Sequence, residues 1–196
     1  MPAMSSPLAQ TFTVEAYAEV EVAGRFLTSV DVYFSAKDDT LPITLEIRNV
    51  INGYPGNKIL PFSRVVKDTA DVNVSDTAAT ATTFTFPSLV FVEIETEYAL
   101  VLKCATPDYN VWITRLGDTD IGGTRTISEQ PHVGLLFKSQ SSTTLFPAPK
   151  EDLKFAIKTA KFDITAAGLV TLTNDDVPTA TLGRDPIIMD ETTTLK

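Results

Sequence analysis

The sequence predicts an all-β protein: an antiparallel two-sheet β-sandwich of the jelly-roll type, followed by a short extended connector. Three observations lead to this fold class. Residues that favour strands are abundant, with 28 Thr, 17 Val and 12 Ile among 196 residues. Apolar and polar side chains alternate in segment after segment, and no long segment keeps the period of a helix. Turn signals recur between these segments.

The alternation marks the expected strands in order along the chain. In 41–50, Ile43, Leu45 and Ile47 point to one side and the polar residues between them point to the other, which indicates a half-buried strand. The same pattern recurs at Phe26/Val30/Val32/Phe34, Phe84/Phe86, Tyr98/Leu100/Leu102, Val111/Ile113 and Leu153/Phe155/Ile157. Short strands separated by frequent turns favour a sandwich over a parallel α/β sheet.

Clusters of Gly, Pro, Asn and Asp separate the expected strands and favour turns. They lie at Lys37-Asp38-Asp39, Asn52 to Asn57, Thr106-Pro107-Asp108, Gly117-Asp118 and Gly122-Gly123. After these, the composition becomes polar, acidic and Thr-rich towards the C-terminus. We expect an N-terminal extension at 1–9, the β-sandwich domain at 10–163 and a polar linker at 164–196 that leads towards a further domain.

Charge and the rare residue types exclude several classes of function. Asp and Glu number 25 against 16 Lys and Arg, and the resulting formal net charge of −9 repels phosphate backbones, so we expect no nucleic-acid partner. With one Cys and one His, an intrachain disulfide, a thiolate metal cluster and a two-imidazole site are excluded. The N-terminal residues lack the pattern of a secretory signal, and no apolar run reaches membrane-spanning length. We expect cytoplasmic synthesis without membrane insertion.

The candidate nucleophile and base have structural interpretations, so we expect no enzyme activity. His132 lies before an apolar segment, with no nucleophile motif such as Gly-x-Ser-x-Gly anywhere in the chain, and is interpreted as a loop or strand-edge residue. Cys104 is in phase with Leu100 and Leu102, which makes it a small core residue. Paired carboxylates occur, but no spacing singles out a glycosidase pair.

Two acidic clusters are candidates for structural calcium. Asp118 and Asp120 lie in one Gly-rich loop, and Asp38 and Asp39 lie in another. Each pair supplies two or three of the oxygens that calcium needs, but neither loop has the length or the terminal Glu of an EF-hand. Asp in turns also caps its own backbone. We expect no cofactor and no metal, with structural calcium at Asp118 and Asp120 as the alternative.

Three aromatic residues are candidates for ligand binding or for an interface: Tyr54, Tyr109 and Trp112. Tyr54 is placed in or near a loop, and Tyr109 and Trp112 on a strand. Trp112 is out of phase with its neighbours in that strand and therefore faces away from their side. Exposed aromatics on a sandwich face would stack on sugar rings, but we favour a role in the core or in an interface.

The segments of the chain from Leu8 to Phe162 resemble, in order, a family of virion structural proteins of tailed phages, known from contractile-tailed phages of marine bacteria such as cyanophages. The segments that carry the resemblance are Leu8 to Val14, Phe26 to Phe34, Ile47 to Val50 with Gly53 to Gly56, Glu97 to Leu102, Val111 to Ile113 with Gly117, Leu136 to Gln140, and Glu151 to Phe155. The chain departs from the family at two places. The family has an aromatic residue where this chain has His132, and it has Trp-Thr-Pro near the position of Thr144 to Pro147 in this chain.

The resemblance implies a non-enzymatic structural module of a phage tail, in the baseplate or a tail fibre, that mediates subunit assembly. The implied location is the virion after synthesis in the host cytoplasm. The implied partners are other tail or baseplate subunits, with a homo-oligomer as a further possibility. The alternative is a host-receptor or carbohydrate-binding module of a tail fibre, and a polysaccharide depolymerase is a third hypothesis that no residue pair supports.

Overall fold

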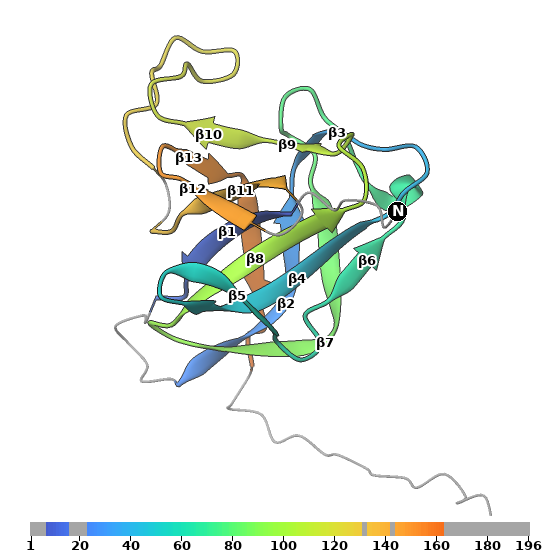
Figure 1. The fold of residues 1–196 in the computed structure, drawn as a ribbon, viewed down its shortest axis with the longest axis vertical. Helices are drawn as coiled ribbons and strands as arrows, with labels where there is room; N and C mark the ends of the chain where they lie inside the picture. The colour runs from blue at the N-terminus through green and yellow to red at the C-terminus, as the bar shows by residue number, and fades with distance from the viewer. Residues whose placement is uncertain (1–6, 16–22, 131–132, 142–143, 163–196) are drawn as a thin grey trace, which may run out of the picture. The chain divides into compact units, whose positions relative to one another are not determined.

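The computed structural model describes residues 7–15, 23–130, 133–141 and 144–162 of the chain. This part of the protein is built from antiparallel strands, with one short 3₁₀ helix, η1 (Thr69–Asp71), and no α-helix (Figure 1). The strands are β1 (Leu8–Thr13), β2 (Gly24–Val32), β3 (Phe34–Ala36), β4 (Ile43–Ile51), β5 (Tyr54–Ile59), β6 (Val65–Lys67), β7 (Thr82–Glu93), β8 (Glu97–Cys104), β9 (Asn110–Val111), β10 (Ile113–Arg115), β11 (Leu136–Ser141), β12 (Thr144–Ala148), β13 (Glu151–Leu153) and β14 (Phe155–Thr159). The all-β prediction is confirmed.

Most strands belong to two sheets. A seven-stranded sheet has the order β12-β11-β1-β8-β4-β5, with β6 also paired to β4, and a three-stranded sheet has the order β14-β2-β7. Two short ladders, β10–β13 and β3–β9, complete the described strands. Strands far apart in the sequence are neighbours, because β1 pairs with both β8 and β11.

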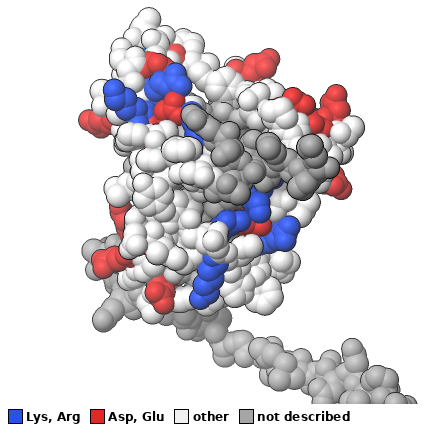
Figure 2. Space-filling model, viewed as in Figure 1, with Lys and Arg blue, Asp and Glu red and all other residues white. Residues whose placement is uncertain are grey.

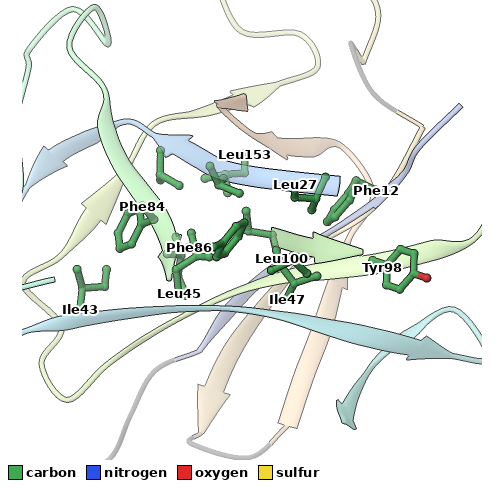
Figure 3. Packing of buried hydrophobic residues seen from close by; sticks show 14 of the residues in the cluster. Phe12, Leu27, Ile43, Leu45, Ile47, Phe84, Phe86, Tyr98, Leu100 and Leu153 are labelled. Atoms are coloured by element: carbon green, nitrogen blue, oxygen red, sulfur yellow. The ribbon is translucent and has the colours of Figure 1, made fainter. Parts of the chain in front are cut away.

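One apolar core lies between the two larger sheets. Leu45 and Leu100 of the seven-stranded sheet, and Leu27 and Phe84 of the three-stranded sheet, belong to the same buried cluster (Figure 3). Each of these four side chains is fully buried. The alternation at Ile43, Leu45 and Ile47 therefore predicts the core face of β4 correctly, since all three side chains join this cluster.

The other face of the seven-stranded sheet is also covered, which the expectation of half-buried strands did not include. Ala9, Ala99, Val101 and Phe137 form a second buried cluster on this face, across β1, β8 and β11. The strands β1 and β8 lie in the middle of the sheet, so both of their faces are packed.

Glu46 on β4 is buried on that same face, with its side chain 1% exposed. Three cations surround its carboxylate: Arg48 at 2.5 Å, Arg64 at 3.6 Å and Lys103 at 3.9 Å. Lysine and arginine atoms gather over β4 and β8 in Figure 2. The expected polar face of β4 is therefore an ion-pair cluster rather than a solvated surface.

The turn expected at Asn52 to Asn57 is shorter in the structure. Only Asn52 and Gly53 form it, both with positive φ (52° and 76°), as in the two-residue turns that connect the strands of a β-hairpin. The residues from Tyr54 onward are strand β5, including Pro55. Pro55 is tolerated because β5 is at the edge of the sheet, where a missing N–H costs no ladder hydrogen bond.

The chain divides into two units, 1–161 and 162–196. The expected linker at 164–196 lies outside the described residues. The expected N-terminal extension at 1–9 overlaps the first strand, because β1 begins at Leu8.

Candidate functional site

The three candidate aromatics lie on different elements and make different contacts. Tyr54 begins β5, whereas Tyr109 and Trp112 flank the short strand β9. The prediction that Tyr109 and Trp112 lie on one strand is wrong, because β9 holds only two residues and its ladder with β3 is irregular. Figure 1 shows β5 and β9 well apart, so these aromatics do not form one binding surface.

Tyr54 covers the second apolar cluster. Its ring centroid lies 5.4 Å from that of Phe137, which is fully buried. The side of Tyr54 that does not face Phe137 meets solvent, with 52% of the residue exposed. Of the three candidates, Tyr54 is the one with a large exposed surface.

Tyr109 fixes a loop onto the main core. Its hydroxyl donates a hydrogen bond of 2.6 Å to the carbonyl oxygen of Leu41, and its ring meets Phe34 edge-on at 6.0 Å. Burial raises the pKa of the Tyr109 phenol, and the negative charge of Asp38 adds to this effect. These contacts give Tyr109 a structural role.

Trp112 joins three segments of the chain. Its indole Nε1 donates a hydrogen bond of 2.8 Å to the carbonyl oxygen of Ser75, and its backbone binds Tyr33 and Lys154 at 2.9 Å each. Its neighbours Val111 and Ile113 pack on the main core, so the indole faces the other way, as the alternation indicated. Because the indole N–H is engaged inside the protein, Trp112 offers no polar handle to a ligand.

The calcium candidates Asp118 and Asp120 lie in the loop after β10. The Asp118 carboxylate is 58% exposed and faces the Arg115 guanidinium at 3.9 Å. The backbone of Asp120 binds Arg125 and Gly123 at 2.9 and 3.1 Å. Among the described residues, no three His, Cys, Asp or Glu side chains gather in a way that would hold a metal ion.

Asp38 caps its own turn, as the alternative interpretation of this cluster held. Its Oδ1 accepts hydrogen bonds from the backbone N–H groups of Thr40 and Leu41, at 2.6 and 2.7 Å. The hydrogen bond from Leu41, followed by that from Thr40, holds the pKa of Asp38 well below its usual range.

Cys104 packs against the main core, as its phase in the strand predicted. Its Sγ donates a hydrogen bond of 3.1 Å to the carbonyl oxygen of Thr106, and burial raises the pKa of the thiol. This is the environment of an unreactive thiol. His132 lies outside the described residues.

A groove that the sequence did not indicate lies between the β10–β13 ladder and the β11–β12 hairpin. Its volume is about 450 Å³. The lining residues are Arg115, Lys138, Phe146, Pro147, Ala148, Pro149, Lys150 and Glu151. Basic and acidic atoms gather over β10 and β13 at the upper left of Figure 2. The groove therefore combines charged groups with an apolar wall.

Glu151 organises the charged side of this groove. Its Oε1 accepts hydrogen bonds from Nε and one terminal nitrogen of Arg115, at 2.8 and 2.6 Å, and its Oε2 pairs with Lys138. Burial raises the pKa of the Glu151 carboxyl, but the hydrogen bonds from Lys138 and Arg115 outweigh this effect and leave the pKa lowered. Glu151 is therefore ionised at neutral pH and holds two cations in place.

A second groove, of about 570 Å³, is lined in part by Val14, Glu15 and Val133. Glu15 and Val133 are next in sequence to segments that lie outside the described part of the chain, so we base no site on this groove. In the described ranges, no helix has the length and apolarity needed to cross a membrane. Comparison of the chain with protein-family models, curated proteins and solved structures gives no match.

Proposed function

We propose that the chain is a non-enzymatic structural module of a phage tail, in the baseplate or a tail fibre, where it mediates subunit assembly. In this proposal the two packed sheets are a jelly-roll sandwich. The first support is the resemblance of the sequence to tailed-phage virion proteins. The resembling segments from Leu8, Phe26, Glu97 and Leu136 supply β1, β2, β8 and β11, and each of these strands brings buried residues into the core.

The observation that carries the proposal is an apolar patch formed by Phe26, Leu89 and Phe91 on the three-stranded sheet. Phe26 and Phe91 are directly opposite in the β2–β7 register, with their ring centroids 5.1 Å apart. Leu89 precedes Phe91 by two residues on β7. The three residues are 37%, 41% and 44% exposed. Adjacent exposed aromatics with an aliphatic neighbour are typical of protein interfaces.

The experiment is cross-linking mass spectrometry on phage particles that contain the protein. Lys158 is a suitable reporter, because it is on β14 of the same sheet and its side chain is 52% exposed. We expect cross-links from Lys158 to another baseplate or fibre subunit, and we expect Phe91→Ser to reduce incorporation into particles. Ile51→Ser, at a residue 57% exposed in the β4–β5 hairpin, is the matched control. Absence of the protein from tail structures would overturn the proposal.

A second candidate function, a host-receptor or carbohydrate-binding module, is favoured by the groove between β10–β13 and β11–β12. Phe146 on its wall is 49% exposed and is placed beside charged groups. Tyr109 and Trp112 do not add to this candidate, because their polar atoms bind the backbone of the protein itself. Tyr54 is on β5, which lies well apart from the β9 region of Tyr109 and Trp112, and it packs on Phe137.

A further inference from the structure

We propose that the groove between the β10–β13 ladder and the β11–β12 hairpin binds a saccharide that carries an acidic group, such as a uronic acid. This inference rests on the second candidate function and is independent of the assembly role.

Two cross-strand pairs face one another in this groove. Lys138 of β11 is opposite Phe146 of β12, so their side chains project from the same face of that hairpin. Arg115 of β10 is opposite Glu151 of β13 in the second ladder. The ion pairs from Glu151 to Arg115 and to Lys138 connect the two ladders. Each ladder therefore contributes one cation to a fixed arrangement.

The groove has an excess of positive charge on a protein of net charge −9. Arg115, Lys138 and Lys150 line it together with one carboxylate, that of Glu151. Asp118, at 3.9 Å from Arg115, offsets part of this excess without removing it. A ligand with a negative charge is favoured here, whereas most of the acidic chain disfavours one.

The cations keep donors available for a ligand. The side chains of Arg115 and Lys138 are 51% and 41% exposed although both bind Glu151. A guanidinium has five N–H donors, and Glu151 accepts from Nε and one terminal nitrogen of Arg115. The remaining donors are held in a fixed geometry, so that a bound carboxylate need not order them.

The side of the groove formed by β12 and the residue after it is apolar and suits a sugar ring. Phe146 is half-exposed, and Pro147, Ala148 and Pro149 continue the wall. The C–H face of a pyranose packs on an aromatic ring, while its acidic group and hydroxyls bind charged side chains. A volume of about 450 Å³ is within the range of small-molecule sites.

A saccharide fits this groove better than an added peptide strand does. β12 is the edge strand of the seven-stranded sheet, where a peptide would pair. Pro147 within β12 has no N–H to donate, so a ladder with an added strand would be interrupted.

The test is a titration of the full chain, followed by NMR or calorimetry, with trigalacturonic acid and with the neutral galactotriose. We expect the acidic sugar to bind with a dissociation constant on the order of 1 mM, a few-contact affinity. We expect the neutral sugar to bind at least about fivefold more weakly. Added salt should weaken the binding of the acidic sugar only, because salt screens exposed charges.

Substitutions assign the binding to the groove. Phe146→Ala and Lys150→Gln should each weaken trigalacturonic acid binding about fivefold, a loss typical of one contact. Phe91→Ala, at an aromatic 44% exposed on the other sheet, and Lys58→Gln, at an exposed lysine on β5, are the controls and should leave binding unchanged. Thermal melting verifies that each variant is folded.

Three results would overturn the inference. Absence of binding at about 20 mM trigalacturonic acid, well above the expected dissociation constant, would show that the groove does not bind acidic saccharides. Equal binding of both sugars would keep the carbohydrate function but reject the acidic class. Equal losses in Phe146→Ala and Phe91→Ala would place the binding elsewhere. None of these results bears on the cross-links that test the tail role.

Discussion

Gln10 and Asp152, which are 142 residues apart in the sequence, are joined by a hydrogen bond of 3.2 Å from Nε2 to Oδ1, and both residues are fully buried. The Oε1 atom of Gln10 also accepts a hydrogen bond of 2.9 Å from the backbone N–H of Leu153. One amide side chain thus ties β1 to β13 at the core.

Replacing Gln10 with Ala should lower the free energy of unfolding by about 2–4 kcal/mol, because it removes a hydrogen bond to a buried carboxyl and opens a cavity. Urea unfolding measures this change. Gln130→Ala removes an exposed hydrogen bond to Pro149 and should cost about 0.5 kcal/mol or less. Equal losses of unfolding free energy in the two variants would show that the buried Gln10 contact stabilises the protein no more than an exposed hydrogen bond does.

Glu46→Gln should lower the free energy of unfolding more than the loss of Arg64, one of the three cations around Glu46, lowers it. Arg48 is 15% exposed and hydrogen bonds to Glu46 through Nε and a terminal nitrogen, at 2.9 and 2.5 Å, so neutralising Glu46 leaves a cation largely buried without its counter-charge. We expect a loss of about 2–4 kcal/mol in unfolding free energy. Arg64→Gln, at a side chain 63% exposed, should cost less than about 1 kcal/mol. The reverse order would contradict the assignment of Arg48 as the main partner.

Asp38 should make the stability of the protein depend on acid pH. Its pKa in the folded state lies below the ordinary value of 3.8, so the unfolded state binds more protons in acid. The stabilisation is fully present above the ordinary pKa and is lost as the pH falls below it. Asp38→Asn should flatten this loss in urea unfolding between about pH 5 and pH 2.5.

The control for the Asp38 experiment is Thr40→Val, which removes the hydroxyl donor at 3.0 Å but keeps both backbone donors. This variant should keep most of the acid dependence of the wild-type protein. If Asp38→Asn and the wild-type protein lose stability in parallel, the capping interaction does not depress the pKa of Asp38.

Trp112→Phe separates a structural role from a sugar-binding role. The variant loses the hydrogen bond to Ser75, so its free energy of unfolding should fall by about 1 kcal/mol. Binding of trigalacturonic acid should be unchanged, because Trp112 is not among the residues that line the groove. Loss of sugar binding without loss of stability would restore Trp112 as a ligand platform.

Local sequence patterns were sufficient for several strands. The alternation of Ile43, Leu45 and Ile47 identified a core face, and the phase of Cys104 placed it against the core. Such patterns depend on neighbouring residues alone, and strand geometry converts them directly into burial. The same reasoning missed β12, because Pro147 argues against a strand unless that strand is known to be at an edge.

Features made by distant residues could not be predicted in this way. Arg115 and Glu151 are 36 residues apart and meet through the register of β10 and β13. Glu46 was expected on a polar face, but the fold buries it and brings two of its three cations, Arg64 and Lys103, to it from elsewhere in the chain. Register between strands distant in sequence is not encoded in any short segment, so neither the groove nor the ion-pair cluster was visible.

The pairing of β1 with β11 and of β2 with β14 has a consequence for synthesis. Leu8 pairs with Lys138 and Val32 with Phe155, so one edge of β1 and one edge of β2 wait for partners made 130 and 123 residues later. The other edges can pair earlier, with β8 and β7. At about 5–20 residues per second, that delay is about 6–26 s. Pairing over such separations also slows folding. One edge of each of these strands therefore remains unpaired for seconds, and a chaperone that shields those edges would raise the yield of folded protein.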